Sequence, residues 1–208
     1  MKQELYHWLY QMDLYREHFS SREAQRSVML NMVKFYEMVH NNGTHLVGPI
    51  NLHELLIDPE NGHFEVKAGG DRDTLMQDID SVKFMPPEIL NKSNRWSLDA
   101  DKFVLAELLF VLRYCKHPYD GRRILNQPIT DINMARQLYS NCRFIFDPDD
   151  SENGLDYYTD PEPMNYWNQD ENSQLKSAFV QVFTQGFSDT RMRYSDIAWK
   201  QLIERKEV

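Results

Sequence analysis

Segment 147–171 contains the densest group of side chains that can bind a cation. It has many acidic residues, three prolines and no lysine or arginine. Oxygen ligands suit Ca²⁺, and the spacing of a calcium-binding loop is roughly followed by Asp149, Ser151, Asn153, Gly154 and Asp160. The flanking helices of an EF-hand are not evident, however. We therefore expect a long, solvated acidic loop, in which Asp149, Asn153 and Asp160 are the candidate metal ligands.

Histidine and cysteine, the other residue types that commonly bind metals, show no grouping along the chain. The seven histidines are scattered, and we interpret them as ordinary surface or core residues. Cys115 and Cys142 lack the close spacing of zinc ligands, and two cysteines in 208 residues do not indicate a disulfide scaffold. We expect no bound cofactor.

Composition limits the classes of partner. The formal net charge of −9 disfavours binding to a phosphate backbone, so we expect no nucleic-acid partner. No stretch approaches the roughly 18 apolar residues of a membrane span, and acidic residues interrupt the N-terminal apolar stretch, unlike in a signal peptide. We expect a cytoplasmic protein with no membrane partner, folded as one domain over 1–208.

Periodic apolar residues predict the first two helices. Leu5, Trp8, Leu9 and Met12 have helical spacing within 4–15. Ser20 and Glu23 then form the pattern of a capping box, which predicts the start of a longer helix ending at Asn42-Gly43. The apolar face of this second helix would contain Val28, Met32, Phe35, Tyr36 and Val39.

The remaining pattern predicts one hairpin and several helices. Two short apolar runs, 55–57 and 64–66, flank a turn signal and predict a small β-hairpin, after which a polar loop runs to about Val82. Residues 102–114 are apolar almost all round, which predicts a helix in the middle of the core. Further helices are expected near 131–140, at 173–184 and from Ser195. The fold class is therefore mainly α.

Four short motifs, in this order, resemble those of the C-terminal lobe of the protein-kinase fold. Residues 85–88 read MPPE and are similar to the motif that closes the kinase activation segment. Residues 97–103 resemble the entry to the family's central buried helix, 117–121 resemble the turn after it, and 189–195 resemble a late arginine motif. Residues 142–150 also look like a bacterial kinase-like subgroup that occurs beside von Willebrand A-domain proteins and metal-dependent phosphatases.

The resemblance implies structural roles for three residues. Glu88 and Arg193 would form the ion pair that ties the activation segment to the late helices. Asp101 would accept hydrogen bonds from backbone amides of the catalytic loop. The resemblance also implies that the nucleotide-binding N-terminal lobe is absent from this chain.

Aligned with the same motifs, the catalytic positions are degenerate. The catalytic aspartate falls on Pro49, the metal-binding asparagine on Glu54, and the aspartate of the Asp-Phe-Gly motif on Ala68. Phosphoryl transfer depends on these groups, so we expect no ATP binding and no enzyme activity.

The preferred interpretation is a pseudokinase that acts as a protein-binding or regulatory scaffold. Without the N-terminal lobe, apolar surface would be exposed for a partner around Leu5, Trp8, Leu9 and Tyr10. One alternative is the C-terminal half of a split serine/threonine kinase completed by another chain. Another is a regulator that binds calcium or a small ligand through the acidic loop.

Overall fold

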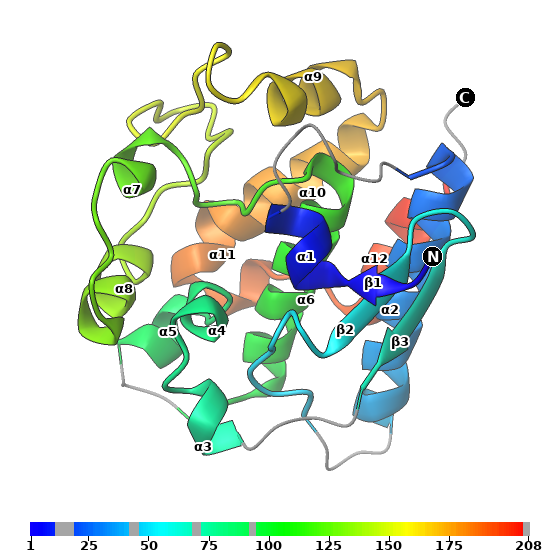
Figure 1. The fold of residues 1–208 in the computed structure, drawn as a ribbon, viewed down its shortest axis with the longest axis horizontal. Helices are drawn as coiled ribbons and strands as arrows, with labels where there is room; N and C mark the ends of the chain where they lie inside the picture. The colour runs from blue at the N-terminus through cyan, green and yellow to red at the C-terminus, as the bar shows by residue number, and fades with distance from the viewer. Residues whose placement is uncertain (11–18, 42–45, 68–71, 92–94, 206–208) are drawn as a thin grey trace.

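The computed structural model describes residues 1–10, 19–41, 46–67, 72–91 and 95–205, and within these ranges the chain is mainly helical with one small sheet (Figure 1). The elements in chain order are β1 Gln3–Glu4, α1 Leu5–Tyr10, α2 Arg22–Asn41, β2 Leu55–Asp58, β3 His63–Val66, α3 Arg72–Leu75, α4 Ile79–Lys83, α5 Pro87–Leu90, α6 Leu98–Tyr114, α7 Arg122–Leu125, α8 Ile132–Tyr139, α9 Pro161–Gln169, α10 Ser173–Phe183, α11 Gln185–Ser188, a 3₁₀ turn Thr190–Met192 and α12 Asp196–Glu204.

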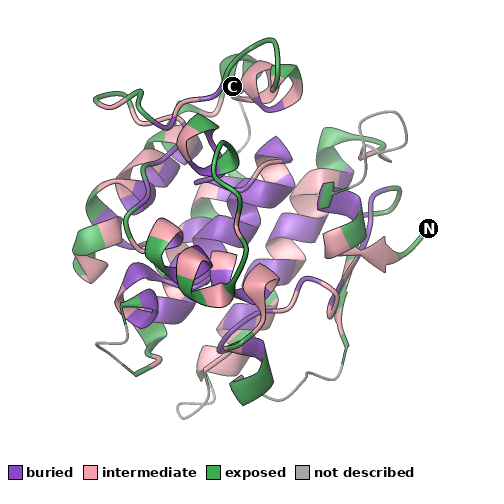
Figure 2. Ribbon diagram, turned by 60° about the vertical axis from the view of Figure 1, so that its left-hand side comes forward, coloured by how far each residue is buried: buried purple, intermediate pink, exposed green. Residues whose placement is uncertain are grey.

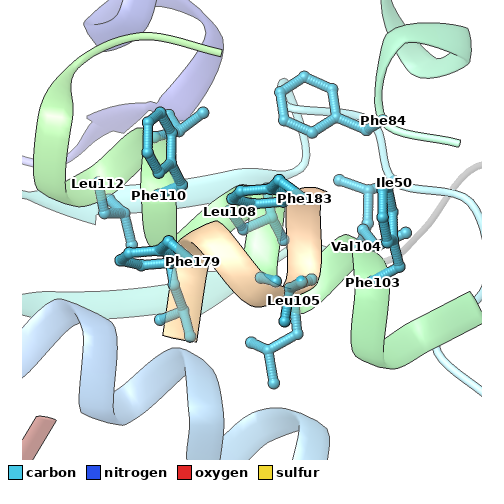
Figure 3. Close-up of a cluster of buried hydrophobic side chains, with 14 of the residues drawn as sticks. Ile50, Phe84, Phe103, Val104, Leu105, Leu108, Phe110, Leu112, Phe179 and Phe183 are labelled. Carbon is cyan, nitrogen blue, oxygen red and sulfur yellow. The ribbon is translucent and has the colours of Figure 1, made fainter. Parts of the chain in front are cut away.

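Helix α6 is the centre of the core, as its apolar sequence predicts. Ser97 begins the helix by accepting a hydrogen bond from the Ala100 N–H, and nearly every side chain from Ala100 to Tyr114 is buried. Figure 3 shows Phe179 and Phe183 of α10 lying against the aromatic and leucine side chains of α6. The ring centroids of Phe110 and Phe179 are 5.3 Å apart at nearly a right angle, the edge-to-face arrangement that aromatic pairs prefer.

The predicted hairpin is confirmed, and a third strand extends it. Strands β2 and β3 pair antiparallel, with Leu55 opposite Val66, and β1 adds to the other side of β2 with Glu4 opposite Leu56. Gly62 closes the hairpin turn at φ +74, and a Cβ there would lie 2.6 Å from the Ser27 Cβ of α2. The turn therefore packs directly on α2, which lies behind the sheet in Figure 1.

Several boundaries differ from the sequence predictions. Ser21, not Ser20, begins α2, because its Oγ accepts from the Ala24 N–H while the Ser20 hydroxyl donates to the Glu60 carbonyl. The polar stretch before Val82 contains α3 and α4, and the predicted acidic loop contains α9, which begins at a proline. No described helix is both long and apolar enough to span a bilayer.

The predicted apolar surface on the first helix is wrong for three of its four residues. Leu5 and Trp8 are fully buried and Leu9 is 5% exposed, whereas Tyr10 is 37% exposed. The three inward side chains join the main core, and the Trp8 ring lies 5.2 Å from that of Phe19. Figure 2 shows the same division, with buried residues on the central helices and exposed residues on the outer turns. Burial of this face removes apolar area from water, which stabilises the fold without any partner.

One buried carboxyl in α6 has no hydrogen-bond partner in the described structure. Both oxygens of Glu107 lack one, and the nearest histidine nitrogen, Nε2 of His117, lies 3.7 Å from Oε1. Burial raises the pKa of the Glu107 carboxyl well above its usual range, so the folded state favours the neutral acid. An unsatisfied buried polar group costs about 1–3 kcal/mol.

We predict that Glu107→Met raises the free energy of unfolding by about 1 kcal/mol. Because the folded pKa is raised, the cost of Glu107 to stability is smallest below its unfolded pKa and grows as pH rises toward the folded pKa. The gain from Glu107→Met should therefore be larger at pH 8 than at pH 5, as measured by urea unfolding. Glu107→Gln, which keeps a buried polar group, is the control. A loss of more than 1 kcal/mol in Glu107→Met, by that measurement, would contradict this account.

Candidate functional site

The segment 46–54, which joins α2 to the hairpin, is held by a single buried carboxylate. Asp101, in the first turn of α6, is fully buried. Its two oxygens accept hydrogen bonds from the backbone N–H groups of Val47, at 2.7 Å, and Gly48, at 3.0 Å. The backbone of this segment is thus fixed by a side chain more than fifty residues away in sequence.

Two side chains complete the environment of Asp101. The Trp96 indole N–H donates to Oδ1 at 2.6 Å, and Nε2 of His40 lies 3.0 Å from Oδ2. The other ring nitrogen of His40 lies 2.6 Å from Asp196, at the start of α12. Asp101 therefore joins α2, segment 46–54 and α6, and through His40 it reaches α12. With its oxygens occupied in this way, Asp101 has a structural role.

Glu88 and Arg193 form a bidentate ion pair. Nη1 and Nη2 of Arg193 donate to the two Glu88 oxygens at 2.6 and 2.9 Å. Arg193 also donates to the carbonyls of Gly186 and Asp99, and its guanidinium lies 4.6 Å from the ring centroid of Phe103. These contacts connect α5 to the 3₁₀ turn and to the start of α6. Nε, Nη1 and Nη2 of the buried guanidinium thus each donate to an oxygen acceptor, as a buried charge requires.

The described positions that align with catalytic groups have few side chains that could take part in phosphoryl transfer. Pro49 is buried, and Glu54 is half-buried just before β2. Glu54 carries the only carboxylate of segment 46–54. Ala68 lies outside the described residues. A proline side chain neither accepts a proton nor binds a metal. Asp101 therefore fixes the backbone of this segment, but residue 49 offers no proton acceptor.

The candidate calcium ligands do not form a calcium loop. Asn153 is fully buried, and its amide donates to the carbonyls of Tyr119 and Arg143 and accepts from the Arg123 N–H. Asp160 pairs with Lys116 at 2.5 Å, whereas Asp149 is exposed. The prediction of a solvated loop is therefore wrong at Asn153, whose side chain holds the segment to the body of the protein. The carbonyl oxygen of Asn153 would lie 1.7 Å from a Cβ at residue 121, which is glycine.

A cluster that the sequence interpretation missed lies beside the sheet. Oε2 of Glu4 lies 2.6 Å from Nδ1 of His53 and 3.4 Å from Nδ1 of His7, and Oε1 accepts from Lys67 at 2.7 Å. The Lys67 and His53 hydrogen bonds lower the pKa of Glu4 to about 2. Glu4 and His7 have the Glu-x-x-His spacing, which was a usable signal in the sequence. In the parts of the chain that the structure describes, this is the one group of three histidine, cysteine or acidic side chains close enough to share a metal ion.

No protein-family model matches the chain, and no curated protein matches it.

We predict that Asp101→Asn lowers the free energy of unfolding by about 3 kcal/mol. The amide replaces one acceptor oxygen with a donor, which faces backbone N–H groups and leaves buried partners unsatisfied. Asp99→Asn, two residues away and bonded to Lys102 at a more exposed position, is the matched control and should cost less than about 1 kcal/mol. Chemical denaturation measures both values, and equal losses in the two variants would refute the special role of Asp101.

Proposed function

We propose that this chain is a non-catalytic module, similar to the C-terminal lobe of a protein kinase, that acts by binding another protein. The observation that carries the proposal is the contrast within segment 46–54. Asp101 holds the backbone of this segment through Val47 and Gly48, while the position expected for the catalytic aspartate is the buried Pro49.

The retained contacts support the kinase-like part of the proposal. Asp101 bonds to the amides of the segment before the hairpin, and Glu88 pairs with Arg193, which are the roles that the resemblance implied. These residues lie far apart in sequence, and their contacts depend on the arrangement of α5, α6 and the 3₁₀ turn. The order of elements, with a long helix, a hairpin and then a central apolar helix, agrees with the same class of protein.

The chemistry of the segment supports the non-catalytic part. Phosphoryl transfer needs a residue that positions the attacking hydroxyl and carboxylates or amides that hold Mg²⁺ on the phosphates. Pro49 offers none of these groups, and Glu54 alone does not replace the set. Losing one electrostatic contributor in an active site already costs about 10²–10³ in rate.

The exposed face of segment 147–171 supports the protein-binding part. Tyr158 is 94% exposed and Tyr157 is 53% exposed, among acidic neighbours such as Asp156. Exposed tyrosines are enriched among the residues that dominate binding energy at interfaces. The acidic surroundings favour a partner with a basic surface. This surface replaces the one expected on the first helix, where three of the four residues are buried.

We predict that the protein neither binds ATP nor transfers phosphate. Adding millimolar ATP and Mg²⁺ should leave the melting temperature unchanged, because a ligand that does not bind the folded state cannot stabilise it. Radiolabelled ATP should give no transfer to the chain itself or to a generic basic substrate. Nucleotide-dependent stabilisation, or transfer that Glu54→Ala abolishes, would instead support a split kinase.

We further predict a protein partner that needs Tyr157 and Tyr158. The protein recovered with the chain from its native host should bind the purified chain directly, with a calorimetric Kd that rises at least about tenfold when Tyr157 and Tyr158 are both changed to serine. Leu125→Ser, at an equally exposed position on α7, should bind as the wild type does. Equal loss in both variants, or no direct binding, would contradict a role for this surface.

A further inference from the structure

We propose that Glu4, His7 and His53 bind a divalent transition-metal ion, with Zn²⁺ as the best match to their ligand atoms. The Nδ1 atoms of both histidines face one oxygen, Oε2 of Glu4. Two imidazole nitrogens and one carboxylate oxygen form a ligand set that zinc uses in open, three-residue sites.

The distances are close to those of a bound zinc ion. The three ligand atoms lie within 4.8 Å of one another. Zinc bonds of about 2.0–2.2 Å in tetrahedral geometry place neighbouring ligand atoms roughly 3.3 Å apart. The His7 to Glu4 distance of 3.4 Å already fits, and the His53 to Glu4 distance of 2.6 Å must lengthen by less than 1 Å. The ion would thus replace the hydrogen bond between Glu4 and His53.

The fold fixes the backbone beneath each ligand. Glu4 lies in β1, where its pairing with Leu56 of β2 sets its position. His7 follows in α1, and the neighbouring Tyr6 N–H donates to the Leu52 carbonyl at 3.3 Å. The His53 N–H donates to Asn51 Oδ1. The ligands therefore come from two segments, 4–7 and 53, that are already hydrogen-bonded to each other.

Neighbouring side chains orient the ligands. The Tyr6 ring stacks on the His53 imidazole, with centroids 4.1 Å apart and planes 26° apart. Lys67 donates to Oε1 of Glu4, which leaves Oε2 facing the histidines. A charged or polar group on the outer side of a ligand is the usual means of orienting it.

The site is also accessible to a cation from solvent. Part of each imidazole is exposed, which leaves room for water at the remaining coordination positions.

The ligand types define which ions the site would take. Imidazole nitrogen suits zinc, copper, nickel and iron, whereas Ca²⁺ and Mg²⁺ require mostly oxygen ligands. Zinc accepts the small, flexible coordination number that three protein ligands and water provide. The site should therefore bind Zn²⁺ and discriminate against Ca²⁺ and Mg²⁺.

The test uses the full chain, without any histidine tag and stripped of metal with a chelator. Calorimetry with ZnCl₂ should show saturable binding of one ion per chain, and Zn²⁺ in excess should raise the melting temperature by at least about 2 °C. CaCl₂ and MgCl₂ should give neither effect. Co²⁺ bound in place of zinc should give the intense visible absorption of a low-coordinate nitrogen-ligated ion.

Matched variants separate this site from adventitious binding. His7→Ala and His53→Ala should each weaken Zn²⁺ binding by at least about tenfold, a loss that even a change in a residue hydrogen-bonded to a ligand can cause. His63→Ala, a half-exposed histidine on β3 beside Glu65, should leave it unchanged. Melting temperatures measured in chelator establish that each variant is folded.

The proposal is overturned if Zn²⁺ gives no saturable heat, if binding survives in the variant that lacks both His7 and His53, or if His63→Ala abolishes it. Loss of binding in His53→Asn, with an unchanged melting temperature in chelator, supports it even if His53→Ala does not fold. Neither the result with ATP nor that with the tyrosine variants bears on this outcome.

Discussion

The fold depends on placing one charged carboxylate, Asp101, in the interior. Burying an unpaired charge costs free energy. Asp101 is tolerated in the interior because two backbone N–H groups, the Trp96 indole N–H and the His40 ring surround its oxygens. Two of these are backbone amides of segment 46–54, which has no regular secondary structure to satisfy them. The Asp101 carboxylate therefore accepts hydrogen bonds from backbone N–H groups that would otherwise lack an acceptor. The same hydrogen bonds stabilise the buried charge. Glu107, on the same helix, has no such hydrogen-bond partners, and burial raises the pKa of its carboxyl.

The elements that sequence alone predicts are those whose signal is local. The apolar run from Phe103 to Leu112 cannot form a surface helix, and the turn residues before Gly62 define the hairpin. Strand β1 could not be predicted, because two residues become a strand only by pairing with β2 some fifty positions away. Helix α9 was missed because its prolines indicate a loop, although proline is well suited to a first helical turn.

The residues of the candidate site also differ in whether their signal is local in the sequence. Resemblance of short motifs indicated Asp101, Glu88 and Arg193, since each lies within a recognisable pattern. The partners His40 and Trp96 have no such pattern, and only the packing of α2 against α6 brings His40 to Asp101. In the metal-binding cluster, Glu4 and His7 share a local spacing, but His53 joins them only through the sheet. Long-range pairing therefore determines the chemistry that the sequence did not predict.

The packing of α12 on α2 has a consequence for biosynthesis. Arg26, early in α2, donates to the carbonyls of Ile203 and Glu204, and His40 meets Asp196 at the other end of the pair. A ribosome releases α2 long before it releases α12, so the nascent chain exposes the face of α2 that α12 later covers. That face stays uncovered until α12 has left the ribosome. In the interval, the uncovered face of α2 is a surface that a chaperone can recognise.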